Sequence, residues 1–378
     1  TISNLGQYIN TAKATEIILG ILLSVVVAFS VGAFVQYSTR LLLTFNFEEK
    51  AKWVAALFGG IAATAITYFI LIKGLKGASF ISGDFKSYIY ENTFTIVFIS
   101  FIFWTTLCAL ITGLFKMSVY KFIIIIGTFA IAMAFAGNDL VNFIGVPIAA
   151  WQSYEAWVVS GIPATEFSME VLASKVPTPT YLLLAAGLVM VLTLWFSSRA
   201  KTVVKTSLDL SSQSDTKERF NPNWMSRGFV RSAMAMSQMA EYILPESWQN
   251  KIERQFEQPS IKVSKTKKID LPAFDLVRAA VNLMVAAVLI SIATSYKLPL
   301  STTYVTFMVA MGTSLADRAW GAESAVYRVA GVLNVIGGWF FTAISAFTAA
   351  AVIALQSKNT ISENLSEHNI KLLLKEKM

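Results

Sequence analysis

The sequence predicts an all-α protein that crosses a membrane several times. Only 14% of its 378 residues are charged, whereas a soluble domain carries roughly 25%. The mean hydropathy is +0.59, and the apolar residues form long runs. Because a bilayer core about 30 Å thick requires about 20 apolar residues per helix, these runs are interpreted as transmembrane helices. Nine tryptophans and twelve tyrosines fit this class, since both anchor helices at the headgroup level.

The apolar runs predict seven spanning helices and one shorter hydrophobic insertion. The spans are expected at about 15–45, 53–72, 94–114, from 119 onward, 180–196, 273–296 and 325–355. The insertion, residues 297–321, has a short apolar core interrupted by hydroxyls and glycines. Non-helical backbone at membrane depth must be buried in protein or line a cavity. We therefore expect a re-entrant hairpin there.

Charge predicts the domain organisation and the topology. Residues 197–270 contain thirteen Lys/Arg and eight Asp/Glu, which favours a cytoplasmic loop by the positive-inside rule. The expected order is a membrane region (1–196) that includes an Asn-Asp motif helix, this loop, a second membrane region (271–356) and a polar tail (357–378). Within the loop, residues 228–256 predict one or two amphipathic helices, either on the membrane surface or solvated.

The composition argues against several functional classes. The single cysteine, Cys108, lies in an apolar run, and the only histidine, His368, lies in the polar tail. Metal sites built on Cys or His, and catalysis by a buried histidine, are not expected. No nucleophile or paired carboxylates suggest a membrane enzyme acting on phosphate esters, so we expect no enzymatic activity, no catalytic residues and no cofactor. The net charge of +8 is attributed to cytoplasmic Lys/Arg rather than to nucleic-acid binding.

The first polar motif is AFAGNDLVNFIGVP, residues 134–147, directly after a long apolar run. In a helix Asn138 and Asn142 share a face at i and i+4, and Asp139 lies about 100° away. Pro147 lacks a backbone donor, so we expect the helix to break or kink here. A charged Asp at mid-membrane costs about 2.5–3.5 kcal/mol. The motif therefore indicates an ion or substrate site; the alternative is a helix cap at the membrane edge.

The second polar motif is LPLSTTYVT, residues 298–306. Pro299 before Ser301, Thr302 and Thr303 predicts a helix start with a hydroxyl at the N-cap. A helix N-terminus has unpaired N–H groups and about half a positive charge, so it suits an anion. Secondary transporters use such termini near the bilayer midplane to bind anionic groups. The alternative is a simple cap on an ordinary span.

Other polar residues lie near the ends of spans. We expect Gln36 and Arg40 to be interfacial and Arg278 to extend toward the headgroups. Asp317 and Arg318 are expected in a hydrated turn, with an ion pair at a gate as the alternative. None of these five is assigned to substrate binding from the sequence.

The two motifs, in this order around a basic loop, resemble the second half of the inorganic phosphate transporter (PiT) family. That family carries GAND-V-x-N and P-x-S-T-T-H motifs, each in two inverted copies. The resemblance is strongest over residues 129–355, and it is closest to the bacterial branch with a long cytoplasmic insertion. It implies part of an inverted-repeat transporter in the plasma or inner membrane, acting as a homodimer.

The resemblance also implies roles for the motif residues. It assigns phosphate binding to five residues: Asn138, Asn142, Ser301, Thr302 and Thr303. It assigns cation binding to Asn138, Asp139 and Ser301, with sodium or a proton at Asp139, because a carboxylate repels phosphate. Three departures stand beside it: AGND replaces GAND, Tyr304 replaces the family's His, and only one copy of each motif is present. The chain is therefore expected to need an N-terminal repeat of the same protein.

These observations predict a symporter that moves inorganic phosphate across the membrane by alternating access, coupled to sodium or protons. Two alternatives remain open. One is a transporter of another oxyanion such as sulfate. The other is a non-transporting membrane sensor or scaffold whose loop or tail binds a partner.

Overall fold

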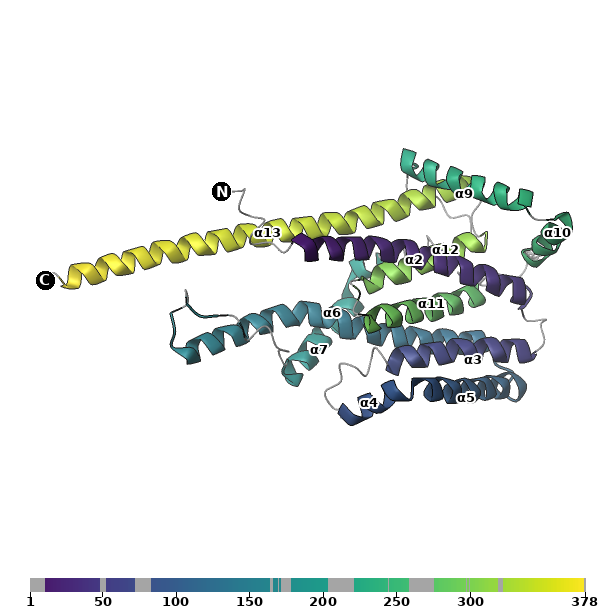
Figure 1. Cartoon of the computed structure of the whole chain (residues 1–378), viewed down its shortest axis with the longest axis horizontal. Helices are drawn as coiled ribbons and strands as arrows, with labels where there is room; N and C mark the ends of the chain where they lie inside the picture. The colour runs from purple at the N-terminus through teal and green to yellow at the C-terminus, as the bar shows by residue number, and fades with distance from the viewer. Residues whose placement is uncertain are drawn as a thin grey trace. The chain divides into compact units, whose positions relative to one another are not determined.

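The computed structural model of the chain describes residues 11–47, 52–71, 83–163, 166–168, 170, 178–202, 221–243, 245–257, 275–296, 298, 300–318 and 322–376. Figure 1 shows its helices. They are α2 (Thr11–Leu43), α3 (Lys52–Phe69), α4 (Gly83–Glu91), α5 (Thr93–Gly113), α6 (Val119–Ser160), α7 (Thr180–Phe196), α9 (Trp224–Ile243), α10 (Glu246–Gln255), α11 (Leu276–Ser295), α12 (Thr302–Ala316) and α13 (Ala322–Glu376). These residues contain no strand, so the predicted all-α class is confirmed.

Among the residues that the structure describes, five helices are long and apolar enough to cross a membrane. They cover Thr15–Leu43, Lys52–Phe69, Thr93–Gly113, Leu276–Ala293 and Val326–Ile353. Shorter apolar helices, Val119–Met133 and Thr180–Phe196, occupy the positions of the other two predicted spans. Length and apolar composition together indicate a membrane protein. The two amphipathic helices expected in the basic loop are also present, as α9 and α10.

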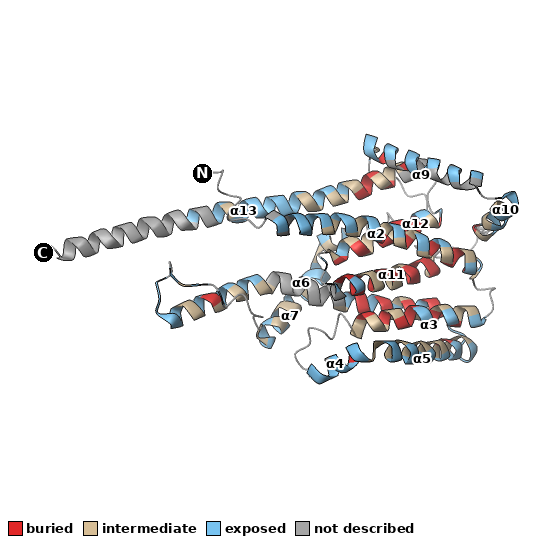
Figure 2. Cartoon of the chain, viewed as in Figure 1, coloured by how far each residue is buried: buried red, intermediate tan, exposed pale blue. Residues whose placement is uncertain are grey.

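The chain divides into two compact units. The first comprises Thr1–Asp215 and Leu244–Ala319, and the second comprises Thr216–Ile243 and Trp320–Met378. In the first unit α11 is central, since it packs against α2, α3, α6 and α12. Figure 2 shows that the buried residues of this unit concentrate on α11, α12 and α3.

Small residues allow the helices of the first unit to approach closely. A Cβ atom added to Gly312 of α12 would lie 2.1 Å from the carbonyl oxygen of Phe29 in α2. One added to Gly32 of α2 would lie 2.9 Å from the carbonyl oxygen of Val309 in α12. The two backbones are therefore in direct contact. Lipid tails are as apolar as the helix surfaces, so the hydrophobic effect does not drive helices together in a membrane. Close packing at small residues stabilises their association instead.

The predicted break in the motif helix is not confirmed. The backbone of α6 is helical from Val119 to Ser160 without interruption, with Pro147 inside it. A proline removes one backbone donor, and adjustments in neighbouring turns or neighbouring helices can compensate for that loss in a membrane helix. Gly145 and Pro147 are therefore compatible with a continuous helix.

Candidate functional site

Helices α11 and α12 form a hairpin whose two ends meet. Asp275 immediately precedes α11 and Asp317 immediately follows α12, and Arg40 of α2 binds both carboxylates. The two helices pack against each other and are joined at the opposite end by residues 296–301. At 15 residues, α12 is about 22 Å long, which is shorter than a bilayer core.

The hydroxyl motif occupies the tip of this hairpin. Ser301 is the N-cap of α12, and its Oγ accepts a hydrogen bond from the backbone N–H of Tyr304 at 3.5 Å. The predicted helix start with a hydroxyl cap is thus confirmed. Thr302 is buried, whereas Thr303 is exposed. Because the first turn of a helix has N–H groups without intrahelical acceptors, the tip combines hydroxyls with backbone donors.

The other predicted site residues, Asn138, Asp139 and Asn142, lie on α6. Their side chains are outside the described residues. Helix α6 packs against α11, and α11 packs against α12. The contact between α6 and α11 is close, since a Cβ added to Gly127 would lie 2.8 Å from Cβ of Leu283. Helix α11 is therefore a shared neighbour of the two helices that carry the motifs.

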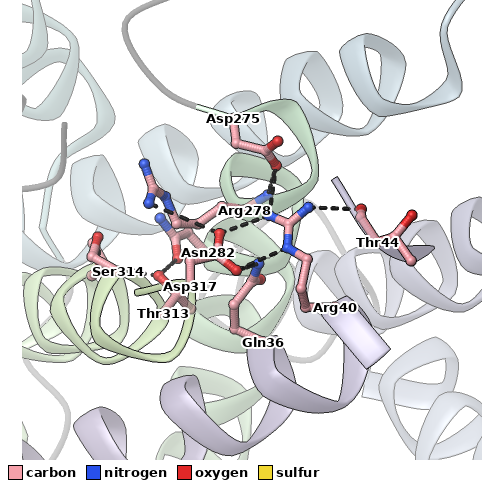
Figure 3. Close-up of polar contacts among 10 residues, drawn as sticks. Gln36, Arg40, Thr44, Asp275, Arg278, Asn282, Thr313, Ser314 and Asp317 are labelled. Atoms are coloured by element: carbon pink, nitrogen blue, oxygen red, sulfur yellow. Dashed lines mark hydrogen bonds and ion pairs between the residues drawn. The ribbon is translucent and has the colours of Figure 1, made fainter. Parts of the chain in front are cut away.

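A buried cluster of charged side chains joins the ends of α2, α11 and α12 (Figure 3). Arg40 donates from Nε to Oδ1 of Asp317 at 2.9 Å and from Nη2 to Oδ2 of Asp317 at 2.7 Å. It also donates to Oδ1 of Asp275 at 3.0 Å and to the carbonyl of Thr44 at 2.9 Å. The ring of Phe45 lies 3.9 Å from the guanidinium carbon. The geometry with Asp317 is bidentate, which is the stronger form of this ion pair.

Two further residues complete the charged cluster. Nη1 of Arg278 lies 3.9 Å from Oδ2 of Asp317, and the backbone N–H of Arg278 donates to Oδ1 of Asp275 at 3.0 Å, which caps α11. Gln36 donates from Nε2 to Oδ1 of Asp317 at 2.8 Å. Two arginines and two aspartates balance, so the cluster has no net charge, which reduces the cost of burying its members.

Beside the cluster, a second set of polar groups joins α11 to α12. Oγ1 of Thr313 is within hydrogen-bonding distance of Oδ1 of Asn282 and of the carbonyl of Ala310. Oγ of Ser314 donates to the same carbonyl at 2.8 Å. Figure 3 shows these side chains next to Asp317.

The sequence predicted exposed or interfacial surroundings for these charged residues, and the structure places Arg40, Arg278 and Asp317 in buried surroundings instead. Arg40 and Asp317 have 0% exposed side chains, and the Arg278 side chain is 1% exposed. Gln36 and Arg40 are therefore enclosed by protein and do not face the headgroups, Arg278 does not extend to the headgroups, and Asp317 is not in a hydrated turn. The sequence signal that could have indicated this buried cluster was the presence of opposite charges at the ends of three apolar helices. That signal does not specify that residue 40 pairs with residue 317.

The chemistry available at the two ends of the hairpin differs. Both carboxylate oxygens of Asp317 already accept hydrogen bonds from protein donors. The described residues contain no group of three or more His, Cys, Asp or Glu side chains that could bind a metal ion. The tip, with the exposed Thr303 and the N-terminus of α12, can still offer donors to a ligand.

Comparison of the chain with protein-family models, with curated proteins and with solved structures found no match. The likeness to phosphate transporters therefore depends on the two motifs and their order alone.

Proposed function

We propose that this protein is a secondary transporter that moves inorganic phosphate across a membrane, coupled to sodium or protons. The observation that carries the proposal is a hydroxyl-capped helix N-terminus at the tip of a helical hairpin, within a bundle of membrane-length helices. A neutral hydroxyl tip suits an anion because the helix dipole and free N–H groups contribute positive potential.

The hairpin is proposed to be re-entrant. Its two ends are held together by Arg40, and α12 is shorter than a bilayer core. Both ends would then face the side of the basic loop that precedes Asp275. The tip would lie at membrane depth, where half-helix termini bind substrates in other secondary transporters.

Asp139 is proposed to act on the cation rather than on phosphate. A carboxylate repels phosphate, but it can coordinate sodium or carry a proton whose charge then favours the anion. Asn138 and Asn142 can donate amide N–H groups to phosphate or offer oxygen to the ion. Together with Ser301, Thr302 and Thr303 they form the proposed substrate site.

Uptake of labelled phosphate by vesicles containing the full-length protein tests this function. We expect accumulation driven by a sodium or a proton gradient, inhibited by excess unlabelled phosphate more strongly than by sulfate. Asp139→Asn should abolish the dependence on the gradient. Asp84→Asn, at an exposed residue of α4, is the matched control and should leave uptake unchanged.

The outcomes separate the alternatives. Stronger inhibition by sulfate would identify a different oxyanion as substrate. No accumulation of either anion would favour a sensor or scaffold and would overturn the proposal. Unchanged gradient dependence in Asp139→Asn would overturn the role of that carboxylate alone.

A further inference from the structure

Helix α9 packs against α13 within the second unit. Figure 1 shows α9 alongside the N-terminal end of α13. The membrane-length stretch of α13 begins at Val326, and the buried residues Ala330 and Val332 lie in its first turns. Further along, α13 exposes Phe341 and Phe347. A helix that packs at the beginning of a membrane span is located near the bilayer–water interface.

The face of α9 directed away from its packing contact is apolar. Ser226 and Val230, one turn apart, are buried. Trp224, Met239 and Tyr242 are 81%, 67% and 92% exposed. At 100° per residue these three lie within about 60° of one another, on the side opposite the buried pair. Large apolar side chains clustered on one exposed helix face indicate a binding partner, because soluble proteins rarely expose contiguous apolar patches to water.

The chemistry of this face matches a lipid headgroup region. Trp and Tyr are enriched at membrane–water interfaces because their rings are amphipathic. Arg227 and Arg231 are exposed along one edge of the apolar face, and Arg231 is about 20° from Trp224 around the helix. Basic side chains near a membrane surface attract anionic lipids. An apolar face edged by arginines is typical of helices that lie in the interface plane.

We propose that α9 lies in the membrane surface at the beginning of α13. Trp224, Met239 and Tyr242 enter the boundary between headgroups and acyl chains, and Arg227 and Arg231 contact the phosphates of anionic lipids. A lipid surface is favoured over a protein partner because the face adjoins a membrane-length helix and combines interfacial aromatic residues with basic ones. This inference does not depend on the transported substrate.

Accessibility of spin labels in vesicles tests this placement. Cys108 is the only cysteine, so Cys108→Ala provides a thiol-free background. Met239→Cys and Tyr242→Cys carry the label on α9. Phe347→Cys on the exposed face of α13 serves as the lipid reference, and Ser87→Cys on the exposed surface of α4 serves as the aqueous reference. Collision with oxygen, which partitions into lipid, is compared with collision with a water-soluble nickel chelate.

We expect the labels at 239 and 242 to favour oxygen, as at 347, and the label at 87 to favour nickel. Nickel access at 239 and 242 equal to that at 87 would show a solvated helix and overturn the proposal. Low access to both reagents would show a protein contact and would overturn it as well.

The role of the arginines is tested by lipid charge. The label at 242 should be less accessible to nickel in vesicles that contain phosphatidylglycerol than in vesicles of phosphatidylcholine alone. In Arg227→Gln/Arg231→Gln this difference should disappear. A difference that persists in the double variant, or that is absent from the parent protein, would overturn the proposed contact with anionic lipids.

Discussion

The two ends of α12 are both polar, but they use their polar groups differently. At the C-terminal end, Asp317 accepts three side-chain hydrogen bonds from Gln36 and Arg40. At the N-terminal end, Ser301 accepts one hydrogen bond, at 3.5 Å, and Thr303 is exposed. At the C-terminal end the protein itself supplies the hydrogen-bond partners of the carboxylate, whereas the N-terminal end retains polar groups that can bind a ligand.

This difference teaches that buried charge alone does not identify a binding site. The side chains of Arg40, Asp317 and Arg278 in this cluster are at most 1% exposed, yet the hydrogen bonds of Arg40 and Asp317 go to the protein. We therefore expect substitutions at the Asp317 end to change stability most. If the tip binds phosphate as proposed, substitutions there should change stability little and phosphate uptake most.

The largest loss of stability is expected for Asp317→Leu. The change removes the carboxylate that pairs with the buried side chains of Arg40 and Arg278, and removing one partner of a buried ion pair costs about 3–5 kcal/mol. The midpoint of thermal unfolding in detergent should fall accordingly. Arg318→Met, at the exposed neighbouring residue, is the control and should change stability by less than about 0.5 kcal/mol.

The paired variant Arg40→Met/Asp317→Leu should recover most of that loss. Both charges leave together, and replacement of a buried ion pair by apolar residues of similar volume is often neutral or stabilising. A double variant no more stable than Asp317→Leu alone would show that Arg40 and Asp317 are not energetically coupled.

The next largest loss is expected for Gly312→Ala. The new methyl group would lie 2.1 Å from the carbonyl oxygen of Phe29, so α2 and α12 must separate, at a cost of about 1–3 kcal/mol. Gly187→Ala in α7, where a methyl group meets no atom within 4 Å, should be neutral or slightly stabilising. Equal thermal unfolding midpoints for the two variants would contradict the close contact.

A smaller loss is expected for Ser301→Ala. Removal of an N-cap hydroxyl costs about 1 kcal/mol, and the 3.5 Å bond to Tyr304 suggests the lower part of the usual range. Ser38→Ala is the matched control, since its hydroxyl bonds the carbonyl of Phe34 in its own helix. If the two serine variants have the same unfolding midpoint, the cap contributes nothing to α12.

The smallest effect on stability is expected for Thr303→Val, within about 0.5 kcal/mol. If the tip binds phosphate, the lost bond to a charged ligand is worth about 1.5–3 kcal/mol, or at least a tenfold weaker affinity. Thr306→Val is the control, because that hydroxyl bonds carbonyls of its own helix. Equal uptake of labelled phosphate by both variants would place the substrate elsewhere.

What could be predicted from the sequence was local. Apolar runs predicted the membrane-length helices, and the Pro-x-Ser-Thr-Thr pattern predicted the start of α12, because both depend on neighbouring residues. The pairing of Arg40 with Asp317 joins residues 277 positions apart, and no single sequence specifies such a partner. The break expected at Pro147 was not confirmed, because a local rule cannot account for compensation by surrounding turns.

The separation between Arg40 and its partners also has a consequence for biosynthesis. Asp275 follows Arg40 by 235 residues and Asp317 follows it by 277. At roughly 5–20 residues per second, a ribosome needs about 12–55 s to produce them. During that interval the new α2 carries an arginine near its end without either carboxylate, and the side chain must reach the headgroups instead. Translation products that stop before residue 275 would lack both carboxylates that bind this arginine.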